Sequence, residues 1–129
     1  MKFTDTQIND GKNKVAKIFM DKFYEFIEDL KNTNGTGYEF GRKYGATFHP
    51  ESVEKHTKNT LTNATWFASQ FFNGGNIDFW TKNGFEKELV WELVKEGFLS
   101  EFTSWKSGSK TFYYIKQDTV KDIFRNYKA

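Results

Sequence analysis

The chain has 129 residues, a formal net charge of +2 and no cysteine. Its length fits a single domain, residues 1–129, with a core large enough to fold without covalent staples. The absence of cysteine excludes disulfides and thiolate-bound metals, and the small net charge does not by itself indicate a nucleic-acid-binding protein.

Hydropathy gives no sign of a membrane protein or of secretion. No stretch approaches the roughly 20 consecutive apolar residues of a membrane span, and the N-terminus lacks the apolar segment of a signal peptide. We therefore expect a cytoplasmic protein with no membrane partner. Phenylalanine occurs 15 times and proline once, so the core must be built largely from aromatic rings. The abundance of lysine and asparagine is typical of AT-rich genomes, which include many phages and mobile elements.

The strongest helical pattern covers about residues 12–32. Val15, Phe19 and Phe23 belong to an apolar stripe at three-and-four spacing, with charged residues largely opposite. We predict a long N-terminal helix that ends near Asn34-Gly35. Thr4 and Gln7 have capping-box spacing and leave an earlier start open. The stripe would support a homodimer if it exceeded what one monomer can cover, but a monomer core explains it equally well.

Glycines punctuate the next segment, residues 33–49, which we expect to be irregular. Its pattern lacks the preceding strand and the spacing of a phosphate-binding loop. Arg42 and Lys43, which are interleaved with aromatic residues, are candidates for a second DNA-binding patch. The alternative is an ordered loop whose rings anchor it to the core.

Helical spacing resumes at Pro50, which suits a first helical turn, and continues to Phe72. This region is either one long helix or two shorter ones broken near Thr60. The run N-G-G-N at residues 73–76 predicts its end. Residues 77–80 are expected to form a strand or a turn packed on the core, and Asn83 is positioned to cap the following helix.

The last third of the chain is predicted as helix, strand, tight turn, strand and helix. Residues 85–97 carry a helical stripe, 98–104 and 110–116 are β-like, 106–109 form the turn, and 118–128 are helical again. A Ser107-Gly108 turn would place Phe102 opposite Tyr113, with both packed inward, whereas a Gly108-Ser109 turn would shift this register by one residue.

Two motifs define this region: L-V-x-x-L-V-x-x-G-F-L over residues 89–99, and a hairpin whose second strand ends in Y-Y-I at 113–115. A helix that ends at glycine, an apolar pair and an aromatic-rich returning strand resemble the second half of winged helix-turn-helix proteins, over about residues 60–129. The resemblance implies an α+β, mostly helical fold. Its C-terminal half would be winged-helix-like, with the long N-terminal helix packed on it, and a recognition helix and a wing would contact DNA.

The resemblance also implies a set of DNA-binding residues. Lys106 and Lys110 would reach the DNA backbone from the wing tip, Lys87 and Lys95 would lie at the groove, and Lys82 would extend their surface. Residues 98–129 sum to +3, but residues 84–97 sum to −2. The outer positions of that helix include four carboxylates, which repel phosphates: Glu86, Glu88, Glu92 and Glu96.

A partner-binding surface is the alternative use of the same region. Trp105, Phe112 and Tyr114 would share one face of the hairpin with Lys110 and Glu101. Exposed rings flanked by lysines stack bases or bind a protein. The competing expectation is that the terminal helices cover these rings. Glu88 and Glu92 would complete a protein-binding surface on the acidic helix.

The residues give no support for catalysis, a metal or a cofactor. His49 and His56 are the only histidines, and their spacing does not match a zinc motif. We expect His49 at a helix start and His56 on the surface, and no nucleophile–histidine–acid set is apparent.

The first functional hypothesis is therefore a small non-enzymatic DNA-binding or regulatory protein, encoded by a phage or mobile element. The second is a protein-binding module that modulates a host nucleic-acid-processing protein through the acidic helix and exposed aromatic residues, as DNA mimics do.

Overall fold

The computed structural model describes residues 2–33 and 38–127, which form an α+β, mostly helical fold, as predicted. Its strands form one three-stranded antiparallel sheet. In chain order the elements are α1 (Asp5–Thr33), α2 (Tyr38–Tyr44), α3 (Pro50–His56), α4 (Leu61–Gln70), β1 (Gly74–Asn76), α5 (Ile77–Lys82), α6 (Lys87–Lys95), β2 (Leu99–Ser104), the 3₁₀ turn η1 (Trp105–Ser107), β3 (Lys110–Ile115) and α7 (Gln117–Asn126).

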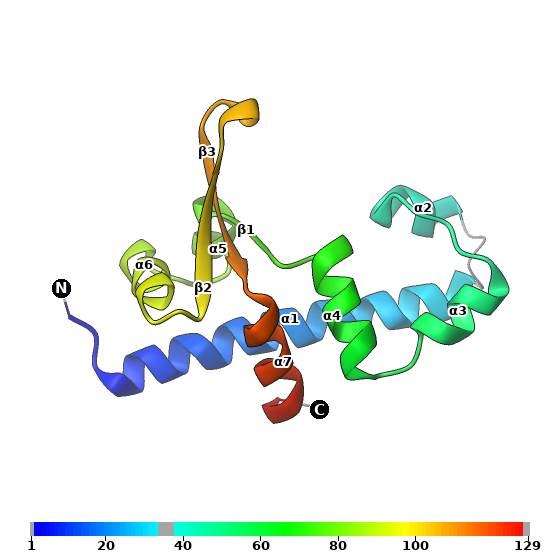
Figure 1. Ribbon diagram of the computed structural model, residues 1–129, viewed down its shortest axis with the longest axis horizontal. Helices are drawn as coiled ribbons and strands as arrows, with labels where there is room; N and C mark the ends of the chain where they lie inside the picture. The colour runs from blue at the N-terminus through cyan, green and yellow to red at the C-terminus, as the bar shows by residue number, and fades with distance from the viewer. Residues whose placement is uncertain (1, 34–37, 128–129) are drawn as a thin grey trace.

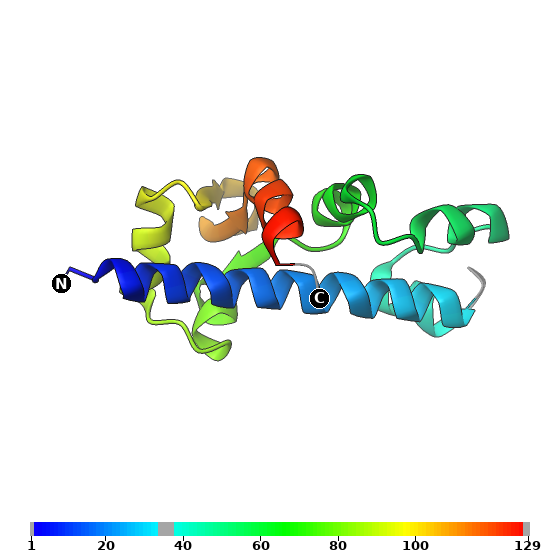
Figure 2. The same cartoon turned by 90° about the horizontal axis from the view of Figure 1, so that it is seen from below.

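Helix α1 runs along the length of the molecule, and the other elements pack along it (Figures 1 and 2). It starts earlier than residue 12 because the capping box forms: the Thr4 amide donates to Gln7 Oε1 at 2.8 Å, and the Gln7 amide donates to Thr4 Oγ1 at 3.1 Å. Gly11 lies inside the helix, where Leu89 of α6 packs close to it. The predicted stop at Asn34-Gly35 lies outside the described residues. The apolar stripe is buried within the chain, so it supplies the monomer core.

Aromatic rings fill the core between α1 and α2–α4, as the composition predicted. Phe26 lies 4.9 Å from both Phe67 and Phe71, measured between ring centroids. It also meets the edge of Tyr44 at 5.1 Å. Phe23 extends the cluster toward α7 by an edge contact with Phe124. Tilted and edge-to-face contacts of this kind are favourable for rings, so α1 holds α2, α4 and α7 through one continuous cluster.

The segment after α1 is more regular than expected. Residues 38–44 form helix α2, so the prediction of an irregular 33–49 was wrong over this stretch. The alternative of two helices is the correct one for residues 50–72. The Thr60 hydroxyl accepts a hydrogen bond from the Asn63 amide at 3.2 Å and caps α4. The buried Asn63 side chain donates to the carbonyls of Lys55 and Lys58 and fixes the connection.

The stretch between α4 and α6 differs most from prediction. The N-G-G-N run supplies β1, which pairs antiparallel with β3, and residues 77–82 form helix α5 instead of a strand or turn. The side chain of Asn76 caps α5 by accepting from the Phe79 amide at 3.0 Å. Asn83 ends α5 and does not cap α6, whose N-cap is Glu86. The Asn76 cap thus starts a helix where local propensity favoured a strand.

The hairpin forms as predicted, but in another register. Phe102 lies opposite Phe112, and Ser100 lies opposite Tyr114. Residues 105–109 connect the strands, with η1 at the start, instead of a two-residue turn. Every cross-strand partner is therefore shifted by one from the Ser107-Gly108 register, which puts Phe102 on the outer face, 57% exposed. Leu99, Tyr113 and Ile115 occupy the inner, buried face.

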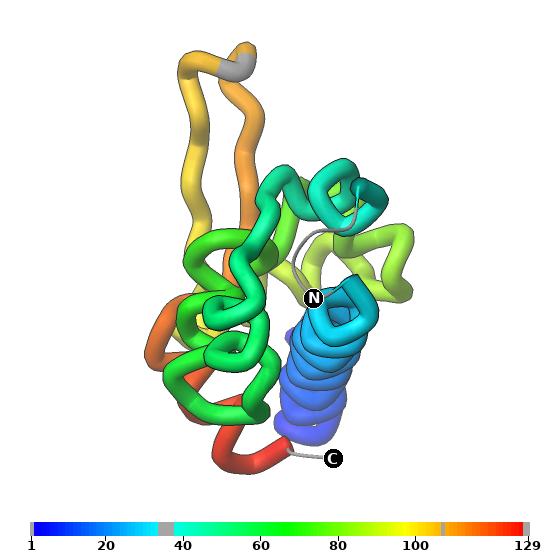
Figure 3. Tube along the Cα trace, turned by 90° about the vertical axis from the view of Figure 1, so that its right-hand side faces the viewer, coloured from blue at the N-terminus to red at the C-terminus, as the bar shows by residue number. Residues whose placement is uncertain are grey.

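The hairpin stands away from the body of the molecule. Figures 1 and 3 show β2 and β3 rising from the α5–α6 region, with their connection at the far end. Strand order β1-β3-β2 leaves β1 beside the base of β3 only. Among the described helices, none combines the length and the apolar character needed to cross a membrane.

Gly74 allows β1 to approach β3. Its φ of 141° is unfavourable for residues with a side chain, and a Cβ there would lie 2.3 Å from the Tyr113 carbonyl oxygen and 3.2 Å from the Trp80 ring. Trp80 is fully buried and donates from Nε1 to that same carbonyl at 3.1 Å. The joint between α5 and the sheet thus has no room for a methyl group.

We expect Gly74→Ala to lower the free energy of unfolding by about 3 kcal/mol, because overpacking adds to backbone strain. Gly45→Ala is the matched control, since Gly45 also has a positive φ of 70° but nothing within 4 Å of an added Cβ. It should cost about 1 kcal/mol. Urea unfolding followed by circular dichroism measures both, and equal losses would contradict the close packing at Gly74.

Candidate nucleic-acid interface

The tip of the hairpin carries exposed basic and aromatic side chains. Lys106 lies in η1 and Lys110 opens β3, both are exposed, and neither forms an ion pair within the described part of the chain. Trp105, next to Lys106, is 80% exposed. The expectation that terminal helices cover the hairpin rings is therefore wrong for Trp105. The tip offers two unpaired cations and an indole ring to solvent.

Helix α6 brings basic and acidic side chains to the surface together. Lys87 opens the helix, Lys95 closes it and Lys82 ends α5, and all three are exposed. Of the four carboxylates, Glu86, Glu88 and Glu96 are exposed and Glu92 is half-buried. Only Glu96 has a salt bridge among the described residues, to Lys12 of α1 at 3.8 Å. The outer surface of α6 is therefore mixed in charge, with an acidic excess.

Contacts with α1 and the sheet fix the position of α6. Leu93 and Val90 are fully buried. The Trp91 indole donates to the Tyr113 hydroxyl at 3.0 Å and ties α6 to β3. The connection between α5 and α6 is held from α1 by Lys14, which donates to the Gly84 carbonyl and lies over the Phe85 ring at 4.7 Å. Helix α6 is thus fixed to β3 of the hairpin, and the connection before it is fixed to α1.

The outer face of the sheet carries three rings. Phe102 and Phe112 face each other across β2 and β3, and Tyr114 follows on β3. Phe112 and Tyr114 are half-buried. With Asn73, Gly74 and Gly75 they line a hollow of about 320 Å³. Phe112 and Tyr114 share a face, as predicted, but the prediction that Phe102 packs inward is wrong, because it assumed a two-residue turn.

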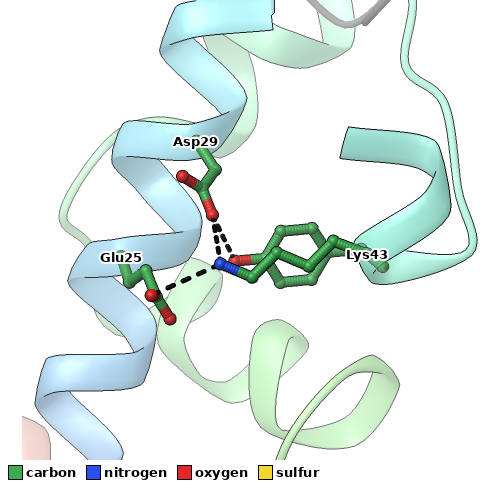
Figure 4. Close-up of polar contacts among 4 residues, drawn as sticks. Glu25, Asp29 and Lys43 are labelled. Carbon is green, nitrogen blue, oxygen red and sulfur yellow. Dashed lines mark hydrogen bonds and ion pairs between the residues drawn. The ribbon is translucent and has the colours of Figure 1, made fainter. Parts of the chain in front are cut away.

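Arg42 and Lys43 do not join the hairpin surface. They lie on α2, at the opposite end of α1 from α6 (Figure 1). The Lys43 ammonium lies 2.9 Å from Asp29 and 3.3 Å from Glu25, both on α1 (Figure 4). The Tyr44 hydroxyl donates to the same Asp29 oxygen at 2.7 Å. Because two carboxylates neutralise the Lys43 ammonium locally, it would attract a phosphate only weakly, and its contacts join α2 to α1. The Arg42 side chain is exposed.

The ionisation of this cluster follows from its contacts. Burial raises the pKa of Asp29, but hydrogen bonds from Lys43 and Tyr44 outweigh it and leave that pKa below its usual value. The bond to Asp29 raises the pKa of Lys43 despite partial burial. Burial, and then the bond to Asp29, raise the pKa of Tyr44. At neutral pH the carboxylate and the ammonium are therefore charged and the phenol is protonated.

The two histidines lie near α3 and do not form a metal site. His49 is the N-cap residue of α3, as predicted, although its side chain makes no capping bond. His56 is half-buried, not a surface residue, and stacks on Trp66 with ring centroids 4.0 Å apart. No group of three potential metal ligands occurs among the residues that the structure describes.

Comparison with known proteins adds no relative. The chain matches no protein-family model, and no curated protein or solved structure is significantly similar to it.

We expect Asp29→Asn to lower the free energy of unfolding by up to about 1 kcal/mol at pH 7, a value typical of partly exposed ion pairs. Because the folded-state pKa of Asp29 is depressed, its contribution is present above the unfolded pKa of about 3.9 and is lost as pH falls through the folded value. The difference between wild type and variant should therefore shrink as pH falls from about 5 toward 3.

Urea unfolding at several pH values measures this dependence. Asp21→Asn is the control, since Asp21 pairs with Lys17 on the exposed surface of α1. It should change stability little at any pH. A difference for Asp29→Asn that stays constant down to pH 3 would contradict the ionic origin of the contact.

Proposed function

We propose that the chain is a small non-enzymatic DNA-binding or regulatory protein of winged-helix type. The observation that carries the proposal is the projecting hairpin, whose tip presents Lys106 and Lys110 without ion-pair partners in the described part of the chain. Lysines free of internal partners neutralise phosphates and release counterions, which is the main source of DNA affinity.

The arrangement of the preceding helices supports the proposal. Helices α5 and α6 are joined by residues 83–86, a four-residue connection that contains Gly84 at a φ of 89°. Helix-turn-helix motifs use a connection of this length and often contain glycine. The short α5 also supplies a helix before the candidate recognition helix α6. Helix α6 then leads directly into β2, as a winged helix requires.

In this mechanism the wing contributes most of the affinity. Lys106 and Lys110 contact the DNA backbone, and Lys87 and Lys95 contact the duplex at the ends of α6, with Lys82 beside them. The carboxylates of α6 reduce affinity through repulsion, so α6 contributes position and selectivity more than binding strength. Arg42 and Lys43 are too far from this surface to take part in the same contact.

We expect Lys106→Ala/Lys110→Ala to weaken binding to a nonspecific duplex and to reduce the slope of log affinity against log salt by up to about 2, one for each lost phosphate contact. Fluorescence polarisation at two or more salt concentrations measures both quantities. Lys55→Ala/Lys58→Ala removes the same charge from the exposed end of α3, far from the hairpin (Figure 1), and should have little effect.

Unchanged affinity and slope in the hairpin variant would reject the wing assignment. Equal losses in both double variants would show that net charge, and not the hairpin, determines the affinity.

A second candidate function rests on the acidic surface of α6. Glu86 and Glu88 are exposed and have no salt bridge among the described residues. Carboxylates on a helix, flanked by exposed rings, would suit the basic site of a host protein that processes nucleic acid. In that case Trp105, Phe112, Tyr114, Glu88 and Glu92 would form the partner-binding surface.

Glu88→Gln separates the two candidates. If α6 faces DNA, the variant should bind the duplex roughly two- to fivefold more tightly, because one repulsive charge is removed. Glu54→Gln on α3 is the control and should leave the affinity unchanged. If neither the wild type nor Glu88→Gln binds the duplex, the DNA-binding proposal fails and protein binding becomes the leading hypothesis.

A further inference from the structure

The outward-facing positions of the sheet have an unusual composition. Because side chains alternate between the two faces of a strand, Ser100, Phe102 and Ser104 of β2 share a face with Lys110, Phe112 and Tyr114 of β3 and with Gly74 and Asn76 of β1. This set contains three rings and one lysine, and it contains no carboxylate. Glu101 lies on the opposite face, across from Tyr113.

A hollow beside β1 leaves these rings accessible. Gly74 is the cross-strand partner of Tyr114, and Gly75 follows it. Both glycines line a hollow of about 320 Å³ together with Phe102, Phe112 and Tyr114. On the other side of β3, Phe102 stays 57% exposed because β2 is the edge strand of the sheet. Exposure of apolar rings to water is unfavourable in free energy, so a patch of exposed rings marks a binding surface.

The basic residues continue this surface toward the tip. Lys110 is two residues before Phe112 on the same face, a separation of about 7 Å along a strand. Trp105 and Lys106 follow at the connection between the strands, and Trp105 is 80% exposed. From the base of the hairpin to its tip, the surface therefore carries Tyr114, then Phe102 and Phe112, then Lys110, and finally Trp105 and Lys106. Rings and cations on one surface match a ligand that carries both flat bases and phosphates.

We infer that the outer face of the β2–β3 hairpin binds unpaired bases of a single-stranded nucleic acid. Phe102, Phe112 and Trp105 stack on the bases, and Lys106 and Lys110 contact the adjoining phosphates. The inference deepens the proposed function, because it assigns a substrate class to the same hairpin and uses the same lysines. A protein partner suits this face less well, since the cations lie among the rings and a nucleic acid has the matching negative charge at every residue.

The test compares a fluorescein-labelled dT12 with a duplex of the same length by fluorescence polarisation at low salt. Phe102→Ala should weaken binding to dT12 about tenfold, the loss expected for one stacked base, and should change duplex binding less than twofold. A U12 arm distinguishes RNA from DNA. Tyr38→Ala removes a ring that is 78% exposed on α2 and should affect neither ligand.

Tryptophan fluorescence gives an independent measurement of stacking. Addition of unlabelled dT12 should quench the emission of the wild type, and Trp105→Phe should remove most of the quenching. Phe102→Leu keeps an apolar side chain without a π-face. It replaces Phe102→Ala if thermal unfolding shows that the latter variant is less stable.

The outcomes separate the two proposals. If the duplex is bound and Phe102→Ala or Phe102→Leu leaves dT12 binding unchanged, the stacking surface is wrong and the proposed function stands. If neither ligand is bound, both proposals fail and a protein occupant is favoured. Loss of dT12 binding with the duplex unaffected is the expected result.

Discussion

The packing of the aromatic stripe of α1 is the constraint on which the rest of the structure depends. Phe23 and Phe26 make ring contacts with α2, α4 and α7, and Gly11 admits Leu89 of α6 at the other end. Elements far apart in the sequence are therefore positioned by one helix. The many ring contacts replace the aliphatic packing of most cores, since few leucines are available. Because rings prefer tilted and edge contacts, such a core fixes the orientation of the packed helices as well as their distance from α1.

The same support explains why the hairpin can project without losing its position. Its inner face is anchored by Tyr113, which accepts from Trp80 at its carbonyl and from Trp91 at its hydroxyl. Those two bonds join β3 to α5 and to α6 within a few residues of the base. Beyond this anchor, β2 and β3 are joined by the hydrogen-bond ladder between them, which holds the tip in place. The hairpin therefore has an anchored base and an exposed tip.

Lysines of this chain take different roles according to what surrounds them. Lys43 lies between Asp29 and Glu25 and joins two helices, and Lys14 holds the α5–α6 connection through a carbonyl and a ring. Lys106 and Lys110 have no such partner among the described residues. Charge counted along the sequence treats these four side chains as equal, whereas the charges of the first two are engaged by internal groups and those of the last two face solvent. This difference directs the functional proposals to the hairpin and away from α2.

The long first helix and the helix–hairpin–helix order of the last third could be predicted from the sequence alone, because these depend on local periodicity and on caps such as Thr4 with Gln7. Helical structure after Pro50 was also predicted, but the sequence left open whether it forms one helix or two. The sequence also identified the exposed lysines of the hairpin. Tertiary structure decided that Gly74–Asn76 forms a strand, since a run of glycine and asparagine becomes β1 only when β3 supplies its hydrogen-bonding partner. It likewise decided the register of the hairpin and so the exposure of Phe102, because the loop length depends on how Leu99 and Ile115 enter the core. Local pattern specifies which residues alternate, but packing against α1, α5 and α6 selects which face of that alternation is buried.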